Sequence, residues 1–239
     1  MTLPWLAPDP VQFPPVTEAL EDPNGLLAAG GELSMDWLLA AYKSGIFPWY
    51  EEGQPLLWWS PDPRLVLFPG EFHASRSLKK LARQQNYQVT MDQAFPAVIK
   101  ACSTAEVRQG AHGTWITTAM QSAYQKLHEE GYAHSVEIWS DGNLAGGLYG
   151  LSIGSAFFGE SMFSLRDNAS KLALLCLARQ LESWGYDFID CQVTSNHLLT
   201  LGAREISRAR FMKLLAEALN GETRLGQWIF NKQLLAHEL

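Results

Sequence analysis

Three consecutive segments near the middle of the chain have short, largely apolar sequences that are typical of β-strands. The segments are residues 135–139, 144–151 and 155–158. Asp141-Gly142-Asn143 separates the first two segments, and Asp-Gly is a favoured sequence for a tight hairpin turn. The pattern therefore predicts three antiparallel strands in succession.

A nearly continuous apolar run from Leu172 to Ala178 follows these strands. It predicts a buried helix over residues 169–184, with Asn168 as its N-terminal cap. A short apolar segment after this helix predicts a strand over residues 188–193.

The other elements are predicted from apolar spacing together with capping and turn residues. Ser34 and Gly45 bound one helix, Asp92 is expected to cap another, and Thr118 with Gln121 resembles a capping box. In chain order these elements are a helix from residue 35, a strand at 65–68, and helices at 75–85, 92–102, 118–130, 196–201 and 207–219. The mixture of helices with an antiparallel meander indicates an α+β fold.

The N-terminal region differs in composition from the rest of the chain. Residues 1–33 are rich in Pro and Gly, as in Phe13-Pro14-Pro15, which predicts turns and extended chain. A length of 239 residues is long for one domain and short for two average ones. We therefore expect one main domain with a smaller appendage.

Composition restricts the class of protein. Apolar residues make up 47% of the chain, which allows a real core, and the net charge of −7 argues against a surface coated with positive charge. The three cysteines lie in apolar contexts, which favours reduced thiols and the cytosol. There is no apolar run of about 18 residues and no signal-peptide pattern, so we expect a cytoplasmic protein that does not enter a membrane.

Aromatic residues gather between residues 47 and 59. One interpretation is packing between a small N-terminal part and the main domain. The other is a stacking platform for a base or an aromatic substrate.

Four cations share one face of the helix predicted at 75–85. Their spacing is i, i+3, i+4, i+7, and the residues are Arg76, Lys79, Lys80 and Arg83. This basic stripe is either a solvated helix face or, in a chain with a surplus of acids, a docking site for phosphates.

Two carboxylates lie among apolar residues, where a charge costs free energy unless it is paired or used. Glu160 follows Phe157-Phe158-Gly159, and Asp190 lies two residues before Gln192 on a predicted strand. Alternation predicts that Asp190 and Gln192 project to the same face, while Cys191 points the other way into the core. The pair is either catalytic or a buried polar pair that satisfies a loop. Cys191 is disfavoured as a nucleophile because no His is near it in sequence.

Several kinds of site are missing from the sequence. The six histidines show no metal-ligand spacing, so no metal is predicted. There is no phosphate-binding P-loop, no dinucleotide glycine fingerprint and no nucleophile elbow.

Five motifs resemble, in this order, those of the leucyl/phenylalanyl-tRNA–protein transferases. The resemblance runs from about residue 13 to beyond residue 210. The motifs are Gly45-Ile46-Phe47-Pro48-Trp49, Leu57-Trp58-Trp59-Ser60-Pro61-Asp62-Pro63-Arg64, Gly113-Thr114-Trp115-Ile116, Gly159-Glu160-Ser161-Met162-Phe163-Ser164 and Asp190-Cys191-Gln192-Val193.

The resemblance implies an enzyme of N-degron tagging. Such enzymes move Leu or Phe, and Met less well, from aminoacyl-tRNA to a protein that begins with Arg or Lys. They need no metal and no cofactor, since aminoacyl-tRNA is a co-substrate. The implied fold is a small N-terminal domain, residues 1–63, and a GNAT-like acyltransferase domain, residues 64–239.

The resemblance also implies roles for individual residues. Asp190 and Gln192 would carry catalysis; because a neutral amide is a poor base, we expect Gln192 to position the amine and Asp190 to hold or deprotonate the ammonium. Glu160 would hold the basic acceptor through a charge-assisted hydrogen bond.

Substrate-binding residues follow from the same resemblance. Trp49 and Trp115 match positions near the terminal adenosine and aminoacyl group, with Tyr42 and Tyr124 nearby. The basic stripe would hold the acceptor-stem backbone without reading its sequence. The apolar pocket for the Leu or Phe side chain would be lined by Phe157, Leu174, Leu177, Leu181 and Ile189. Leu177, Leu181 and Leu148 depart from the bulkier or Met residues expected there, which leaves the preference between Leu and Phe open.

Three rivals remain at the level of sequence. One is another aminoacyl-tRNA-dependent transferase, such as one that builds peptidoglycan bridges. The second is a non-catalytic RNA-binding module, which gives no reason for Glu160, Asp190 and Gln192. The third is an acyl-CoA acetyltransferase, disfavoured because the pyrophosphate-binding loop of that class is missing.

Overall fold

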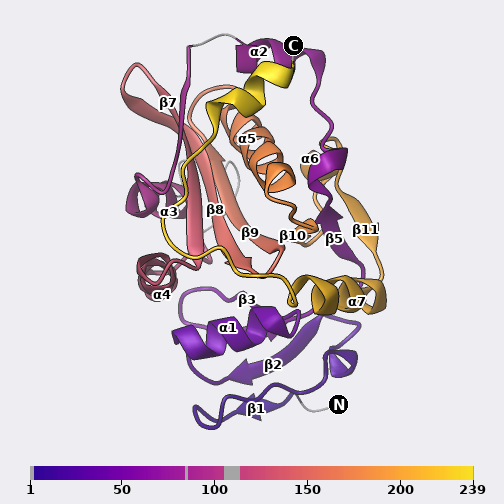
Figure 1. Ribbon diagram of the computed structural model, residues 1–239. Coiled ribbons are helices and arrows are strands. Elements are labelled where there is room, and N and C mark those ends of the chain that lie inside the picture. The colour runs from indigo at the N-terminus through magenta and orange to yellow at the C-terminus, as the bar shows by residue number, and fades with distance from the viewer. Residues whose placement is uncertain (1–2, 84–85, 105–113, 239) are drawn as a thin grey trace.

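Seven strands form the central sheet, in the spatial order β11-β5-β10-β9-β8-β7-β6. The computed structural model describes residues 3–83, 86–104 and 114–238 (Figure 1). Neighbouring strands are antiparallel, except that β10 runs parallel to β9. The strands are β5 Arg64–Leu67, β6 Gln88–Met91, β7 Ala133–Ser140, β8 Asn143–Ile153, β9 Ala156–Ser164, β10 Phe188–Gln192 and β11 Arg204–Ile206.

Helices cover both faces of this sheet. The elements are α2 Arg76–Arg83, α3 Phe95–Ser103, α4 Thr118–Glu129, α5 Ala169–Ser183, α6 Asn196–Leu199, α7 Arg208–Ala218, and the 3₁₀ segments η2 Pro69–Glu71 and η4 Lys232–Glu238. The long apolar helix α5 packs on β7, β8 and β9 from one side, and α2 and η4 pack on α5. Helix α3 packs on the same three strands from the other side. The mixed architecture confirms the α+β prediction.

A second, four-stranded sheet lies beside the central one (Figure 1). Its order is β1-β2-β4-β3, and helix α1 Met35–Lys43 packs between it and the rest of the protein. The elements are β1 Trp5–Leu6, η1 Val16–Glu18, β2 Leu26–Gly30, β3 Phe47–Pro48 and β4 Leu57–Trp59. Trp37 and Trp58 stack in its core, which is continuous with the core around Tyr124 and Phe158 of the main sheet. The boundary between residues 63 and 64 stays a prediction, because this shared core crosses it.

Turn and cap residues explain where several elements begin and end. Asp141 and Gly142 both have positive φ, 53° and 75°, which is the type I′ geometry that joins twisted strands. The predicted hairpin between β7 and β8 is therefore confirmed. Gly45 has φ 73° just after α1, and an added Cβ there would lie 2.6 Å from Met212 Sδ.

Two predicted caps are wrong. Thr117, not Thr118, caps α4 by accepting a hydrogen bond from the Met120 amide at 3.2 Å. Asp92 lies before α3 but does not cap it. Its carboxylate instead accepts the amide hydrogen bonds of Ser135 and Trp228, which ties β7 to the C-terminal segment.

The predicted strands and helices agree with the structure except at the short elements. The sequence does not predict strands β1, β2, β3, β4, β6 and β11, and β9 extends six residues beyond the expected end at residue 158. The predicted helix 75–85 is present as α2, although residues 84–85 lie outside the described part of the chain. The longer β9 matters most, because it carries Glu160.

Candidate active site

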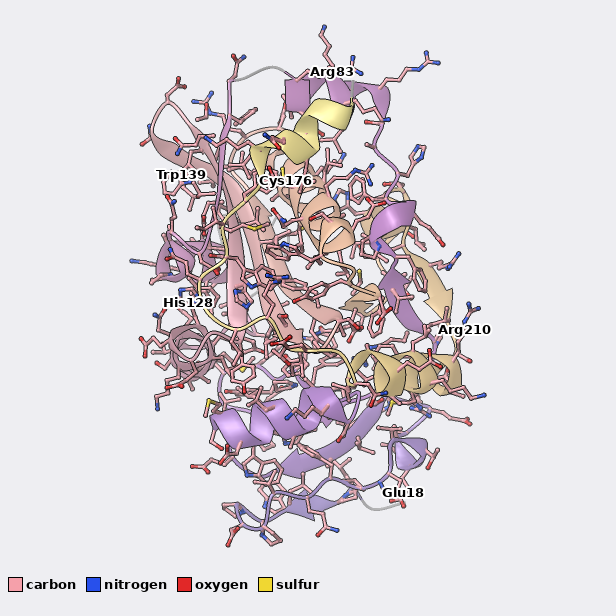
Figure 2. The ribbon with its side chains drawn as sticks, viewed as in Figure 1. Glu18, Arg83, His128, Trp139, Cys176 and Arg210 are labelled. Atoms are coloured by element: carbon pink, nitrogen blue, oxygen red, sulfur yellow. The ribbon has the colours of Figure 1, made fainter. Side chains whose placement is uncertain are left out.

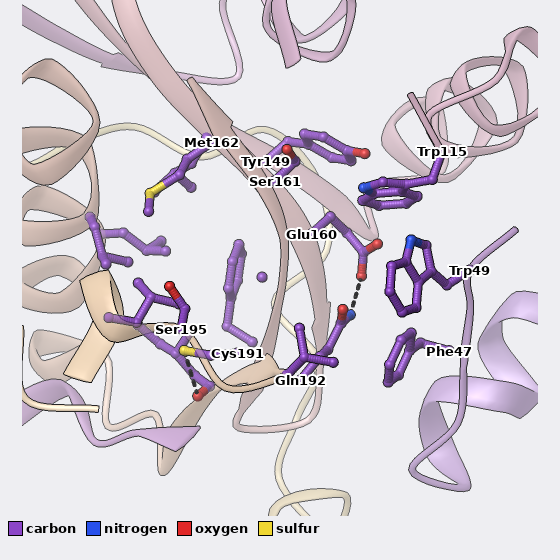
Figure 3. Close-up of a pocket in the computed structure, with 18 of the residues that line it drawn as sticks. Phe47, Trp49, Trp115, Tyr149, Glu160, Ser161, Met162, Cys191, Gln192 and Ser195 are labelled. Atoms are coloured by element: carbon purple, nitrogen blue, oxygen red, sulfur yellow. Dashed lines mark hydrogen bonds between the residues drawn. The ribbon is translucent and has the colours of Figure 1, made fainter. Parts of the chain in front are cut away.

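Strands β9 and β10 pair over only three residues and then separate. Their partners are Phe188 with Ala156, Ile189 with Phe157 and Asp190 with Phe158. Beyond that point a cavity of about 430 Å³ opens between the two strands (Figure 3). It is lined by Phe47, Pro48, Trp49, Trp115, Leu148, Tyr149, Phe157, Gly159, Glu160, Ser161, Met162, Leu174, Leu177, Ile189, Cys191, Gln192, Val193, Ser195 and Leu198. A separation of this kind supplies a pocket without breaking the sheet.

A β-bulge aims Glu160 at the cavity. Tyr149 pairs with Ser161 and Gly150 with Gly159, so Glu160 is the extra residue on β9. Bulges redirect single side chains and are common next to active sites. Among the described residues that line the cavity, Glu160 is the one carboxylate.

In the described part of the chain, three groups donate hydrogen bonds to Glu160, and all three are neutral. Tyr42 donates to Oε1 at 2.6 Å, Tyr124 to Oε2 at 2.9 Å, and the Gln192 Nε2 group to Oε1 at 2.8 Å. The two tyrosine hydroxyl oxygens also lie within hydrogen-bond distance of each other. Burial raises the pKa of Glu160 to about 7, and the three donors oppose that rise. Glu160 therefore changes its protonation state near neutral pH.

Gln192 is held in an unusual backbone conformation. Its φ is +64°, which is costly for a residue other than Gly, and a register shift separates it from Asp190. The backbone amide of Gln192 donates to Asp190 Oδ1 at 2.9 Å, while its side chain reaches Glu160. These two bonds hold the amide of Gln192 at the cavity wall.

Asp190 does not line the cavity. It is fully buried and forms a bidentate pair with Arg64, with Nε to Oδ1 at 2.8 Å and Nη2 to Oδ2 at 2.7 Å. Arg64 is itself buried between the rings of Phe47 and Phe211. The prediction that Asp190 and Gln192 project side by side is therefore wrong. The register shift in β10 turns the side chain of Gln192 toward the cavity and leaves that of Asp190 facing Arg64. Sequence reasoning gave Arg64 no role.

Cys191 lies on the cavity side of β10. The prediction that it points into the core is therefore wrong. Burial raises the pKa of its thiol, which keeps it protonated at neutral pH and agrees with its not being a nucleophile.

Most of the apolar residues that the sequence suggests for the donor side chain meet in this cavity, and their role in binding it stays a prediction. Phe157, Leu174, Leu177 and Ile189 line the cavity, whereas Leu181 is buried and does not line it. Sequence reasoning missed two members of this wall, Met162 and Leu198, although Met162 stands in a quoted motif. Figure 3 shows Met162 at the opposite side of the cavity from Trp49.

Some aromatic residues between positions 47 and 59 pack in the core, and others line the cavity. Phe47 and Trp58 are buried in the core, which is the packing role. Trp49 is 43% exposed and lines the cavity with Trp115, and Figure 3 shows both rings at the Glu160 end. Tyr42 and Tyr124 lie behind Glu160 and do not line the cavity.

The basic stripe lies on α2 (Figures 1 and 2), where Arg83 is labelled at the end of the molecule opposite Glu18. Leu78 is buried on the inner face of α2, and Arg76, Lys80 and Arg83 are exposed. The helix carries no acid. Gly113, the first residue of the Gly113-Thr114-Trp115-Ile116 motif, lies outside the described residues.

Two kinds of feature are absent from the described residues. No set of three or more His, Cys, Asp or Glu side chains in that part of the chain could hold a metal ion. No helix in residues 3–83, 86–104 or 114–238 is both long and apolar enough to span a membrane.

Two family models match the chain. Residues 66–216 match the model described as leucyl/phenylalanyl-tRNA protein transferase, and residues 31–62 match the model for the N-terminal domain of the same enzymes.

Relatives that carry this name are similar over nearly the whole length. A leucyl/phenylalanyl-tRNA–protein transferase of Pseudomonas fluorescens (strain SBW25) is 57% identical over 227 residues, which is 95% of this chain and 99% of the relative. One of Aromatoleum aromaticum is 59% identical over 230 residues, 96% of each chain.

Among solved structures, FemX is similar in fold. Its TM-score is 0.50 at 13% identity, over 86% of this chain and 71% of FemX. FemX has a GNAT-like acyltransferase fold, so this likeness confirms the predicted fold.

Proposed function

The chain belongs to the leucyl/phenylalanyl-tRNA–protein transferase family and is therefore an aminoacyltransferase, and we propose that its acceptors are proteins that begin with Arg or Lys. In this proposal Leu or Phe, and Met less well, is transferred to the α-amine of such a protein in the cytoplasm. The new N-terminal residue marks the protein for N-degron degradation. No cofactor is needed, because the donor ester of aminoacyl-tRNA is already activated.

The observation that carries the proposal is the polarity of the cavity. Most of its lining is apolar and suits a Leu or Phe side chain, and Glu160, the one carboxylate among the described lining residues, suits a cationic acceptor. The apolar lining and Glu160 belong to one cavity, so an aminoacyl carbonyl and an acceptor amine can meet in it.

The residues then divide into three roles. Trp49 and Trp115 stack against the terminal adenosine and hold the aminoacyl ester. Glu160 holds the cationic acceptor, and the carbonyl oxygen of Gln192 accepts a hydrogen bond from its amine. Asp190 contributes to catalysis through Gln192, whose backbone amide it binds.

The tRNA body is held outside the cavity. We assign its acceptor-stem backbone to the basic stripe, which supplies positive charge without hydrogen bonds to base edges. The net charge of the chain is −7, so an acid-free helix of four cations is a local exception that an RNA backbone would use.

The experiment offers labelled Leu-tRNA and Phe-tRNA to two reporter proteins that differ only in beginning with Arg or Met. We expect label on the Arg reporter and none on the Met reporter, and an Arg reporter with an acetylated N-terminus should also stay unlabelled. Equal labelling of the Arg and Met reporters would refute the acceptor rule. No labelling of any reporter would refute the transfer itself.

A further inference from the structure

We propose that Glu160 is the catalytic group that takes the proton from the acceptor's α-ammonium, and that Tyr42 and Tyr124 form with it a hydrogen-bonded ring that completes when the proton arrives. This inference rests on the proposed function and adds the identity of the base.

When Glu160 is ionised, the ring has fewer protons than hydrogen-bonding contacts. Three oxygen–oxygen contacts join Tyr42 to Tyr124, Tyr42 to Glu160 Oε1, and Tyr124 to Glu160 Oε2. Each tyrosine has one hydroxyl proton, so the ionised carboxylate leaves one of the three contacts without a hydrogen. A proton on Glu160 Oε2 supplies it: Glu160 donates to Tyr124, Tyr124 to Tyr42, and Tyr42 to Oε1. The geometry thus accommodates the proton-bearing form of Glu160.

The charges around Glu160 agree with this count. Tyr42 and Tyr124 keep their protons, because burial and the neighbouring Glu160 raise the pKa of each hydroxyl well above its usual value. Among the described residues, Tyr149 on β8 and Asp190 on β10 also act on the ring electrostatically, and the negative charge of Asp190 raises the pKa of Glu160 further. The cation Arg64 is committed to Asp190 and does not neutralise Glu160.

The alternative bases are less well placed. Both oxygens of Asp190 are engaged by Arg64, and Asp190 is absent from the residues that line the cavity. Gln192 is a neutral amide whose nitrogen is committed to Glu160. A carboxylate has about four acceptor positions, and donors from the described residues use three of them on Glu160, which leaves a fourth position for the acceptor amine.

The transfer breaks two kinds of bond and forms one amide bond. One N–H bond of the α-ammonium breaks and its proton goes to Glu160. The nitrogen lone pair then forms the bond to the ester carbon, and the bond from that carbon to the ribose oxygen breaks. The ribose oxygen leaves with a second proton from the nitrogen, and Glu160 later releases its proton to solvent. Because an α-ammonium has a pKa of about 8 and Glu160 one of about 7, the first transfer is nearly balanced in energy.

The test compares Glu160→Gln with Glu137→Gln. Glu137 is a matched control because it is also a buried glutamate bound by neutral donors, Thr90 and Ser135, but lies away from the cavity. Single-turnover transfer from Leu-tRNA to peptides that begin with Arg or its neutral isostere citrulline is measured at saturating peptide across pH. We expect Glu160→Gln to lower the maximal rate with Arg by about 10²-fold or more and to remove the limb of the pH–rate profile near pH 7. Glu137→Gln should keep the rate and the profile.

Other outcomes would overturn the proposal. If Glu160→Gln kept the maximal rate and raised only the KM for the Arg peptide, Glu160 would bind the acceptor without acting as a base. If wild-type enzyme transferred nothing, the proposed function itself would fail, which is a different result.

A readout independent of turnover uses infrared difference spectra of wild type minus Glu160→Gln. We expect the protonated-carboxyl band to disappear with a midpoint near pH 7. A carboxyl group that is already fully ionised at about pH 5.5 would refute the ring, whatever the kinetics.

Discussion

The two carboxylates on either side of the β9–β10 separation differ in how their charge is balanced. Asp190 is paired with a buried guanidinium, faces away from the cavity and binds the Gln192 amide. Glu160 faces the cavity, and its donors among the described residues are all neutral. The balanced region fixes the backbone, whereas the unbalanced region can still gain a cation or a proton. In this protein, unbalanced charge marks where a ligand or a reaction is expected.

The largest expected effect comes from unbalancing the paired region. Asp190→Ala leaves Arg64 buried without its partner, and we expect a loss of about 3–5 kcal/mol in the free energy of unfolding, measured by urea denaturation. The double variant Arg64→Met, Asp190→Leu removes both charges and should recover most of that loss. A loss below about 1 kcal/mol in the single variant would mean that the pair does not hold the strand.

Removing the charge of Glu160 should have the opposite effect and increase the free energy of unfolding at high pH. Glu160 has a pKa of about 7 in the folded protein against an ordinary value of 4.5, so the folded state binds the proton more tightly. Its contribution to stability is therefore complete below about pH 4.5 and lost as the pH rises through about 7. Glu160→Gln should thus stabilise the protein at pH 8 relative to pH 5, by up to about 3 kcal/mol. Parallel stability curves for the variant and wild type from pH 5 to 8 would contradict this.

A smaller effect should distinguish the cavity wall from the filled core. Met162→Ala enlarges the apolar part of the cavity, so the ratio of kcat/KM for Phe-tRNA over Leu-tRNA should rise by about tenfold. The control Leu172→Ala, on the same side of the sheet but outside the cavity lining, should cost about 2–5 kcal/mol of stability and leave the ratio unchanged. An unchanged ratio in Met162→Ala would place the donor side chain elsewhere.

The smallest expected effect concerns tRNA binding by the exposed cations of α2, compared with those of α7. The cations of α2 have no acid on their helix, whereas α7 carries Glu217 one turn after Lys213. Arg76→Ala with Lys80→Ala should weaken binding of all tRNAs and reduce the slope of log K against log salt by about 1.5. Arg210→Ala with Lys213→Ala is the matched control and should change neither. An unchanged slope in the α2 variant would refute the assignment of the basic stripe.

Sequence patterns predicted the long elements well, because periodicity and turn chemistry are local. The β7–β8 hairpin follows from Asp141-Gly142, and α5 follows from its apolar run. Strands β2, β6 and β11 are short, and their pairing partners are distant in sequence, so local patterns do not reveal them.

The sequence predicted most residues of the candidate site, but not the directions in which their side chains point. The motifs brought forward Glu160, Gln192 and most of the apolar wall, and these residues do meet in one cavity. Simple alternation failed at Asp190 because a register shift and a positive φ at Gln192 interrupt β10. The role of Arg64 depends on an ion pair across 126 positions, which no local pattern contains.

The hydrogen-bonded ring determines when the enzyme can become active during its synthesis. Its three members are separated by 82 and 36 positions, and Gln192 follows 32 positions later. No shorter stretch of chain contains the reactive carboxyl in its working environment. A ribosome must therefore release nearly the whole protein before the chemistry can begin, so an unfinished copy cannot tag its neighbours. For the same reason, a protein expressed as two fragments that are divided between Ser60 and Pro63 should transfer no amino acid until the fragments associate.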